Sequence, residues 1–281
     1  MSMDTVSVWV IFFATVILVV LAIEAGFRLG HHMRQTSEDE KESPVSAIAA
    51  AILTLTGFML AFTFGISSDR LQDRKKLVRE EANAIGTAWL RSDFLPEPDR
   101  AESKGLFRKY VDDRLEAAQG QDLKQVQNVL DESRRIHNQL WDIAVKNARK
   151  DMNSDVAALY IESLNELINI HALRVAIALH PQIPGMIWLV LYALVVFGMI
   201  ATGYQTAITG SARRSHAVWL LAVSFSLVIA LIAVLDRPQS DLIKVPQEPL
   251  IDLQASMAAN IKRAENWGAG TEKQAGESLQ P

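Results

Sequence analysis

Few side chains in this sequence have the types and spacing that chemistry at a site requires. The chain has six histidines and no cysteine, which excludes disulfides, thiolate catalysis and cysteine-ligated metal sites. His31 and His32 are adjacent, so they cannot share one face of a helix as paired metal ligands do. His137 and His171 fall in separate predicted helices, and we interpret each as a surface or hydrogen-bonded interior histidine. With no phosphate-binding glycine loop and no HExxH motif, the sequence predicts no enzyme, no catalytic residues, no metal site and no cofactor.

Polar side chains do recur at helical spacing in one place. They lie three or four residues apart on one side of a predicted helix: Glu80, Asn83, Thr87 and Arg91. Glu80 and Arg91 are predicted to close a structural polar network between helices, which Asn165 and Asn169 of a later helix would join. The alternative is a solvated helix face or a simple ion pair, because nothing beside these residues supplies a nucleophile.

The segment 44–67 carries the second candidate site, a face that could line a pore. Small residues repeat every four positions and would let another helix approach closely: Gly57, Ala61 and Gly65. Phe58 and Phe62 have the same spacing and lie about 100° further around the helix. A partly polar line runs along a third side: Thr56, Leu60, Thr63 and Ser67. The alternative is that the hydroxyls bond to their own helix and the phenylalanine rings meet lipid.

The elements that position these residues are predicted to be helices, four of them in a membrane. Long uncharged apolar runs are separated from a charged middle region, which indicates membrane spans around an extramembrane part. The predicted spans are 6–23, 44–67, 186–205 and 217–235. The fold class is therefore all-α, with a helical bundle inserted between spans two and three. A net charge of −4 and no basic patch interleaved with aromatics argue against nucleic-acid binding.

The chain divides into five regions by composition. Residues 1–67 hold spans one and two, residues 68–184 form the helical extramembrane domain, and residues 185–236 hold spans three and four. Residues 237–265 are predicted to carry a short amphipathic helix that docks on the bundle. Residues 266–281 are rich in Gly, Glu, Gln and Ser and are predicted to be disordered.

Local signals set the helix boundaries in the extramembrane domain. The helix of span two is predicted to continue without interruption to about Leu95, because no proline breaks it earlier. Asp99 and Glu102 fit a capping box for the next helix. Asn153 or Ser154 is predicted to cap the last helix of the domain.

The orientation in the membrane stays open. Four spans put both termini and the extramembrane domain on one side. The short loops on the other side hold basic residues that favour an inside location: Arg28, Arg34, Lys41, Arg213 and Arg214. Against this, five basic residues follow span two directly, between positions 70 and 79.

Three stretches together carry a family resemblance. They are GFMLAFTFGISSDR at 57–70, LVREEANAIGTAWLRSDFLP at 77–96 and LDRPQSDLIKVPQEPLIDL at 235–253. The combination resembles the bacterial bestrophin-like family, a group without an assigned function named for distant similarity to bestrophin channels. Bestrophins are four-span pentameric ion channels in which the second span lines a narrow neck. Their topology places the helical domain inside, against the count of basic residues in the short loops.

The resemblance implies an oligomeric ion channel, a pentamer, in the bacterial inner membrane, with the lipid bilayer and ions as its partners. Phe58 and Phe62 are then the positions expected to form a hydrophobic constriction that gates by dewetting. The acidic residues after Asp236 are too widely spaced to form a calcium clasp like that of bestrophins. The competing hypothesis is a non-conducting membrane scaffold or sensor whose helical domain binds a partner.

Overall fold

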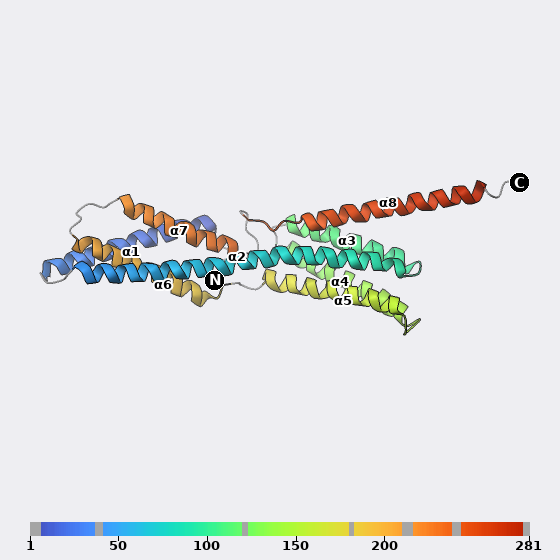
Figure 1. Ribbon diagram of the computed structural model, residues 1–281, viewed down its shortest axis with the longest axis horizontal. Coiled ribbons are helices and arrows are strands. Elements are labelled where there is room, and N and C mark those ends of the chain that lie inside the picture. Colours follow the sequence, from blue (N-terminus) through green and yellow to red (C-terminus); the bar gives the residue numbers. More distant parts are fainter. Residues whose placement is uncertain are drawn as a thin grey trace. The chain divides into compact units, whose positions relative to one another are not determined.

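The computed structural model describes residues 7–36, 42–119, 123–179, 183–209, 216–237 and 243–277. Every regular element in those ranges is a helix, which confirms the predicted all-α fold (Figure 1). The chain forms two compact units. The membrane unit comprises Met1–Gln72 and Leu179–Lys244, and the bundle unit comprises Asp73–Ala178 and Val245–Pro281.

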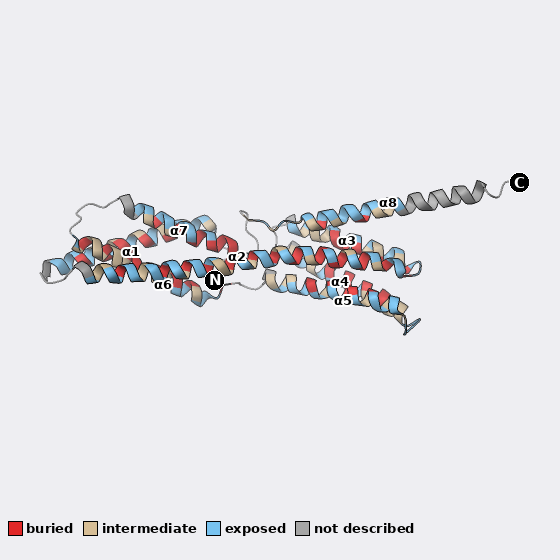
Figure 2. Ribbon diagram, viewed as in Figure 1, coloured by how far each residue is buried: buried red, intermediate tan, exposed pale blue. Residues whose placement is uncertain are grey.

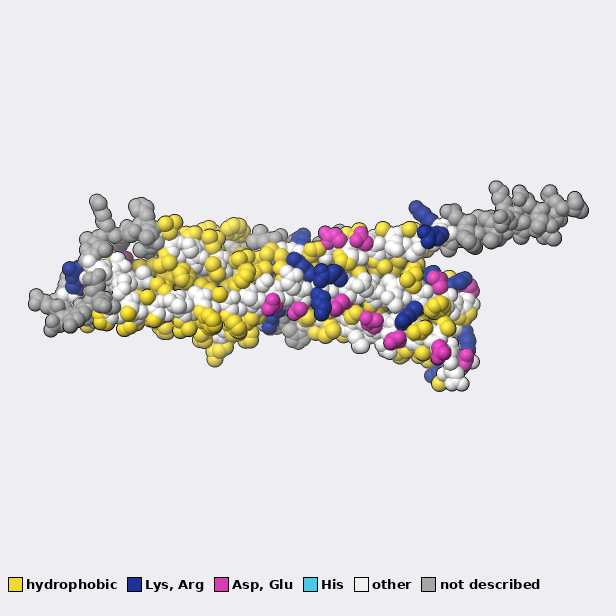
Figure 3. Space-filling view, viewed as in Figure 1, with side chains coloured by type: hydrophobic (Ala, Val, Ile, Leu, Met, Phe, Trp, Pro, Cys, Tyr) yellow, Lys and Arg dark blue, Asp and Glu magenta, His cyan; other side chains and the backbone are white. Residues whose placement is uncertain are grey.

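The membrane unit contains the helices that are long and apolar enough to cross a bilayer. They are α1 (Val8–Thr36), the first part of α2 (Glu42–Arg91), α6 (Gly185–Ile208) and α7 (His216–Asp236). Side chains exposed on this unit are mainly apolar, and Figure 3 shows hydrophobic residues gathered over it. Because a contiguous apolar surface of this kind is unfavourable in water, these helices are membrane spans, as predicted.

The backbones of α1 and α6 touch along a glycine seam. A Cβ atom at Gly26 would overlap the carbonyl oxygen of Ile200, and one at Gly203 would overlap that of Ile23. At Gly30 an added Cβ would lie 2.7 Å from the carbonyl oxygen of Tyr204. From Gly26 to Gly30 on α1 the contacted carbonyl advances from Ile200 to Tyr204 on α6, so the two helices run parallel, as the first and third of four successive spans must.

The bundle unit packs one end of α2 with the helices that follow it. They are α3 (Asp99–Gln119), α4 (Leu123–Ala148), α5 (Asp155–Leu179) and α8 (Glu248–Glu277), with a short 3₁₀ turn, η2 (Ser92–Phe94), after α2. Buried residues recur along each of these helices at the spacing of one face (Figure 2). The largest fully buried side chains of the core are Trp89, Phe107, Tyr110, Ile136, Leu140 and Tyr160.

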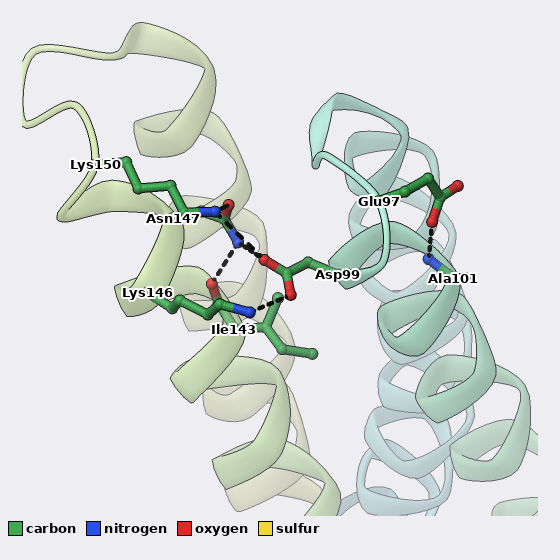
Figure 4. Close-up of polar contacts among 7 residues, drawn as sticks. All are labelled: Glu97, Asp99, Ala101, Ile143, Lys146, Asn147 and Lys150. Atoms are coloured by element: carbon green, nitrogen blue, oxygen red, sulfur yellow. Dashed lines mark hydrogen bonds and ion pairs between the residues drawn. The ribbon is translucent and has the colours of Figure 1, made fainter.

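The starts of two helices test the predicted caps. The Ser154 hydroxyl accepts a hydrogen bond from the Ala157 amide at 3.2 Å, so Ser154 caps α5. At α3 the structure turns the Asp99 carboxylate away from its own helix, toward α4 (Figure 4). Glu97 accepts from the Ala101 amide at 3.2 Å instead. The capping box with Glu102 fails because Asp99 is buried against α4, with only 2% of its surface exposed.

The C-terminal helix α8 is longer than predicted. Its beginning docks on the bundle as expected, because Leu250 and Met257 are buried in the bundle core. Gln254 also donates a hydrogen bond of 2.6 Å to Asp112 of α3. The helix then continues to Glu277, through most of the region predicted to be disordered. This region has no proline before Pro281 and many Ala, Glu, Lys and Gln residues, which favour helix.

Candidate functional site

The partly polar line of α2 faces the interior of the membrane unit. Thr56, Thr63 and Ser67 are fully buried, and Leu60 nearly so. The Thr56 hydroxyl donates to the carbonyl of Ile52 at 2.7 Å and lies 3.3 Å from that of Leu194 on α6. Thr63 likewise donates to its own helix, at the Met59 carbonyl. Thr56 and Thr63 therefore behave as the back-bonding alternative describes, and their hydroxyls do not lie on the outer surface of this unit.

Phe58 and Phe62 occupy the other side of α2. Their side chains are 66% and 57% exposed. At 100° per residue, they lie about 150° around the helix from the buried line. The described part of the chain leaves the two rings largely uncovered, so the surfaces that can cover them are lipid and another protein copy.

The small-residue stripe of α2 is also open. A Cβ atom added at Gly57 or at Gly65 would meet no atom of the described residues within 4 Å. Ala61, between them, is exposed. The stripe is therefore not a packing seam within the described chain, where that role belongs to Gly26 and Gly203.

The predicted polar line in the bundle unit is only partly assembled. Arg91 reaches α5, where it donates to the Leu159 carbonyl at 2.6 Å and lies 3.5 Å from Glu162. Glu80 instead pairs with Lys76 on its own helix, at 3.5 Å. Thr87 and Asn165 are exposed, so the line is mainly a solvated face.

Three of the predicted network residues line one shallow hollow of about 610 Å³ between α2 and α5. Its lining comprises Glu80, Asn83, Glu162, Glu166, Asn169 and Ile170. The structure therefore brings Glu80, Asn83 and Asn169 together, but around open space and not in a buried network.

The buried network of the bundle centres on Glu81, one residue further along α2. Glu81 is fully buried and accepts a hydrogen bond of 2.6 Å from the Tyr110 hydroxyl of α3. Two arginines pair with the same carboxylate: Arg114 of α3, whose Nε lies 3.4 Å from Oε1, and Arg174 of α5. His171 of α5 places its Nδ1 2.9 Å from the Tyr110 hydroxyl and 3.7 Å from Glu81.

His137 completes this network from α4. Its ring lies edge-on to that of His171, with the ring centroids 4.8 Å apart, and 5.0 Å from the Tyr110 ring. Burial, followed by the charges of His171 and Arg114, lowers the pKa of His137 to about 3. Burial, with Arg114 and Arg134, lowers the pKa of His171 to about 4. Both rings are therefore neutral near pH 7, as expected of interior histidines, although the sequence did not indicate that they meet.

A signal for this network was present in the sequence. Glu81 lies four residues after Leu77 and four before Ile85, both of which are buried in the bundle core. His171 lies four residues after Leu167, which is also in that core. A charged or titratable residue at a core position of an apolar stripe is the pattern that identifies a buried polar group. The polar line predicted from the sequence, which includes Glu80, lies one residue away from this pattern.

Comparison with known proteins gives one match. The family model described as "Bestrophin-like domain" matches residues 12–250, which is most of the chain and covers parts of both units. No curated protein and no solved structure matches the sequence. The resemblance identified from the three sequence stretches is thereby confirmed at the level of the family.

Proposed function

The chain belongs to the bestrophin-like domain family, and from this premise we propose that several copies assemble around an axis into an ion-conducting pore lined by α2. The observation that carries the proposal is the pair of exposed rings, Phe58 and Phe62, on a membrane helix whose opposite side is fully packed. The proposal involves no catalytic step and no cofactor, and the membrane is that of a bacterial cell.

The open surface of α2 suits a helix at the centre of a ring of copies. Such a helix needs one face toward the axis and a flanking face toward a neighbouring copy. The phenylalanine pair and the Gly57–Ala61–Gly65 stripe lie about 100° apart around the helix, which matches that requirement. The small-residue stripe allows close helix approach, and the rings then project toward the axis.

A ring of phenylalanine side chains would act as an apolar constriction. Water leaves a narrow apolar passage readily, and a dewetted passage blocks ions without a steric plug. Phe58 and Phe62, one helical turn apart, would supply two stacked layers of this kind. Thr56 and Thr63 lie on the packed side of α2 and are not assigned to the pore surface.

The first test is the native mass of the purified protein in a lipid-like environment. A ring of three or more copies, with a pentamer as the form expected from the resemblance, supports a shared axial pore. A monomer or dimer overturns the pore, and the protein would then be better described as the non-conducting scaffold or sensor.

The second test measures ion efflux from liposomes that contain the protein. Phe62→Ala should raise the basal efflux several-fold, because removal of the rings widens and wets the constriction. Phe197→Ala on α6 is the matched control, since its ring is 59% exposed on the same unit but on another helix. Equal efflux from wild type and both variants would contradict a gate at Phe62.

A further inference from the structure

The Glu81 network draws its members from four helices of the bundle unit. Glu81 comes from α2, Tyr110 and Arg114 from α3, His137 from α4, and His171 and Arg174 from α5. With both histidines neutral, the charges are one carboxylate and two guanidinium groups. The network therefore holds an excess positive charge before any histidine is protonated.

The hydrogen bonds leave one arrangement of protons for His171. The Tyr110 hydroxyl has a single proton, and at 2.6 Å from the buried Glu81 carboxylate it donates that proton to Glu81. Tyr110 therefore accepts its 2.9 Å bond from His171, which must carry its proton on Nδ1. A second proton on His171 would go to Nε2, on the far side of the ring from Glu81.

His137 is poorly placed to hold a charge. Its Nε2 is buried and has no hydrogen-bond partner within the described ranges, and its side chain is 6% exposed. The ring lies against His171 and Tyr110, so a proton there would sit among ring contacts and near the charge of Arg114.

The charged groups around the histidine pair are predominantly positive. Arg114 of α3 and Arg174 of α5 pair with Glu81 within the network, and the charge of Arg134 on α4, which pairs with Asp131 at the surface, also reaches His171. Among the described members of the network, Glu81 on α2 is the acidic group, and it already pairs with both arginines. A protonated histidine would thus add positive charge to a buried site whose carboxylate already has two cationic partners.

We propose that this network is an acid-operated latch: the bundle unit stays closed while His137 and His171 are neutral, and their protonation loosens the packing of α4 and α5 at the network. The latch concerns the bundle unit alone, so it holds whether or not the membrane unit conducts ions.

The direction of the effect follows from linkage. A histidine whose pKa is lower in the closed state than in the open one stabilises the closed state at high pH, and this contribution is lost as the pH falls below the open-state value of 6.5. For His171, with a closed-state pKa of about 4, opening at pH 5 is favoured about thirtyfold relative to pH 8. Carboxylates with lowered pKa values, such as Asp99, act only below their ordinary value of 3.8, outside this range.

The experiment is hydrogen–deuterium exchange of the full chain in lipid nanodiscs between pH 7.5 and 4.5, corrected for the intrinsic pH dependence of exchange. Peptides of α4 and α5 in the wild type should lose protection at least about tenfold below pH 6. The variant His171→Asn keeps an N–H donor near the position of Nδ1, and His137→Phe keeps the ring contacts. The double variant carries no titratable ring, so its protection should stay constant over the same range.

The control is the double variant His31→Asn and His32→Asn, which removes two exposed histidines of the membrane unit. It should open like the wild type. Protection in the wild type that does not change down to pH 4.5, or equal loss in the wild type and the His137/His171 variant, overturns the latch.

A measurement on the wild type alone tests the proposal even if the His137/His171 variant fails to fold. Deuterium exchange at the histidine C2 position reports the pKa of each ring. His137 and His171 should titrate well below the ordinary histidine value of 6.5 as long as the bundle is closed. Ordinary pKa values near 6.5 for both buried rings would overturn the proposal.

Discussion

At the scale of single residues, two neighbouring carboxylates of α2 lie in different environments: Glu81 is buried and Glu80 is in contact with solvent. Glu81 is fully buried between two arginines, whereas the Glu80 side chain is 41% exposed and pairs with Lys76 on the surface. Removal of one member of a buried charged group leaves its partners uncompensated, whereas exposed pairs contribute little.

We therefore predict that Glu81→Gln lowers the free energy of unfolding of the bundle unit by about 3–5 kcal/mol. The matched change Glu80→Gln should alter it by no more than about 0.5 kcal/mol. Urea titration followed by tryptophan fluorescence measures both, since Trp89 is buried in the same core. Similar losses for the two variants would show that Glu81 is not the centre of the network.

Asp99 gives a prediction at lower pH. Hydrogen bonds from Lys146 and then Asn147, at 2.6 and 2.7 Å, hold the pKa of Asp99 below its ordinary 3.8 (Figure 4). Its contribution to stability is thus present above pH 3.8 and is lost as the pH falls through the lowered value.

Asp99→Asn should therefore lower stability by up to about 1 kcal/mol at pH 6, a small effect because the lysine end is exposed. Thermal unfolding of the wild type and the variant at pH 6 and at pH 2.5 measures this loss of stability. The difference between variant and wild type should disappear at the lower pH, and a constant difference would rule out an effect through the carboxylate charge.

At the scale of elements, the space around each glycine shows whether its helix face packs on another helix of the chain or is open. Gly203→Ala should prevent α1 and α6 from closing, because the new methyl group would overlap the Ile23 carbonyl. We expect a loss of folded protein in the membrane and a lower melting temperature in detergent. Gly105→Ala in α3 is the control, since nothing lies within 4 Å of its Cβ position and alanine favours helix by about 1 kcal/mol. Its unfolding temperature should rise.

Gly57→Leu tests the open stripe of α2. A Cβ atom at this position meets no atom of the described residues within 4 Å, and Gly57 lies on an open face, so the fold of a single chain should persist. If another copy packs on this stripe, the native mass should fall toward that of a monomer. An unchanged mass would place the contact between copies elsewhere on the membrane unit.

The elements also show what periodicity can predict. The start of α5 at Asp155 agrees with the predicted cap, because Ser154 caps it and apolar residues recur along its full length. The end of α8 could not be predicted, because a stretch of polar helix formers with glycines is compatible with both helix and disorder. The α1–α6 seam was missed because small residues in several spans have similar spacing, and only the packed structure shows which of them meet a backbone.

At the scale of the whole molecule, an even number of spans fixes which segments share a side of the membrane. The end of α1 that carries Arg28 and the tip of the bundle that carries Met152 must lie on opposite sides. Because the chain has no cysteine, the variants Arg28→Cys and Met152→Cys each introduce a single reactive thiol, at side chains 78% and 82% exposed. A membrane-impermeant maleimide should label one in intact cells and the other only after lysis. Labelling of both in intact cells would contradict four spans.

The same experiment settles the orientation that charge counts left open. The sequence predicted the all-α fold and the four helices long and apolar enough to cross a membrane, because long apolar runs are an unambiguous signal. It did not predict how the buried polar groups meet. Glu81, His137 and His171 are separated by many residues, and only packing of four helices brings their side chains together.

The glycine seam between α1 and α6 has a mechanical consequence. Where carbonyl oxygens of one helix lie directly over the Cα atoms of the other, neither sliding nor rotation is possible without backbone overlap. The two helices must therefore move as a single rigid body. Within the membrane unit, any change of shape has to be a displacement of α2 or α7 relative to that body, and α2 is the helix that carries Phe58 and Phe62.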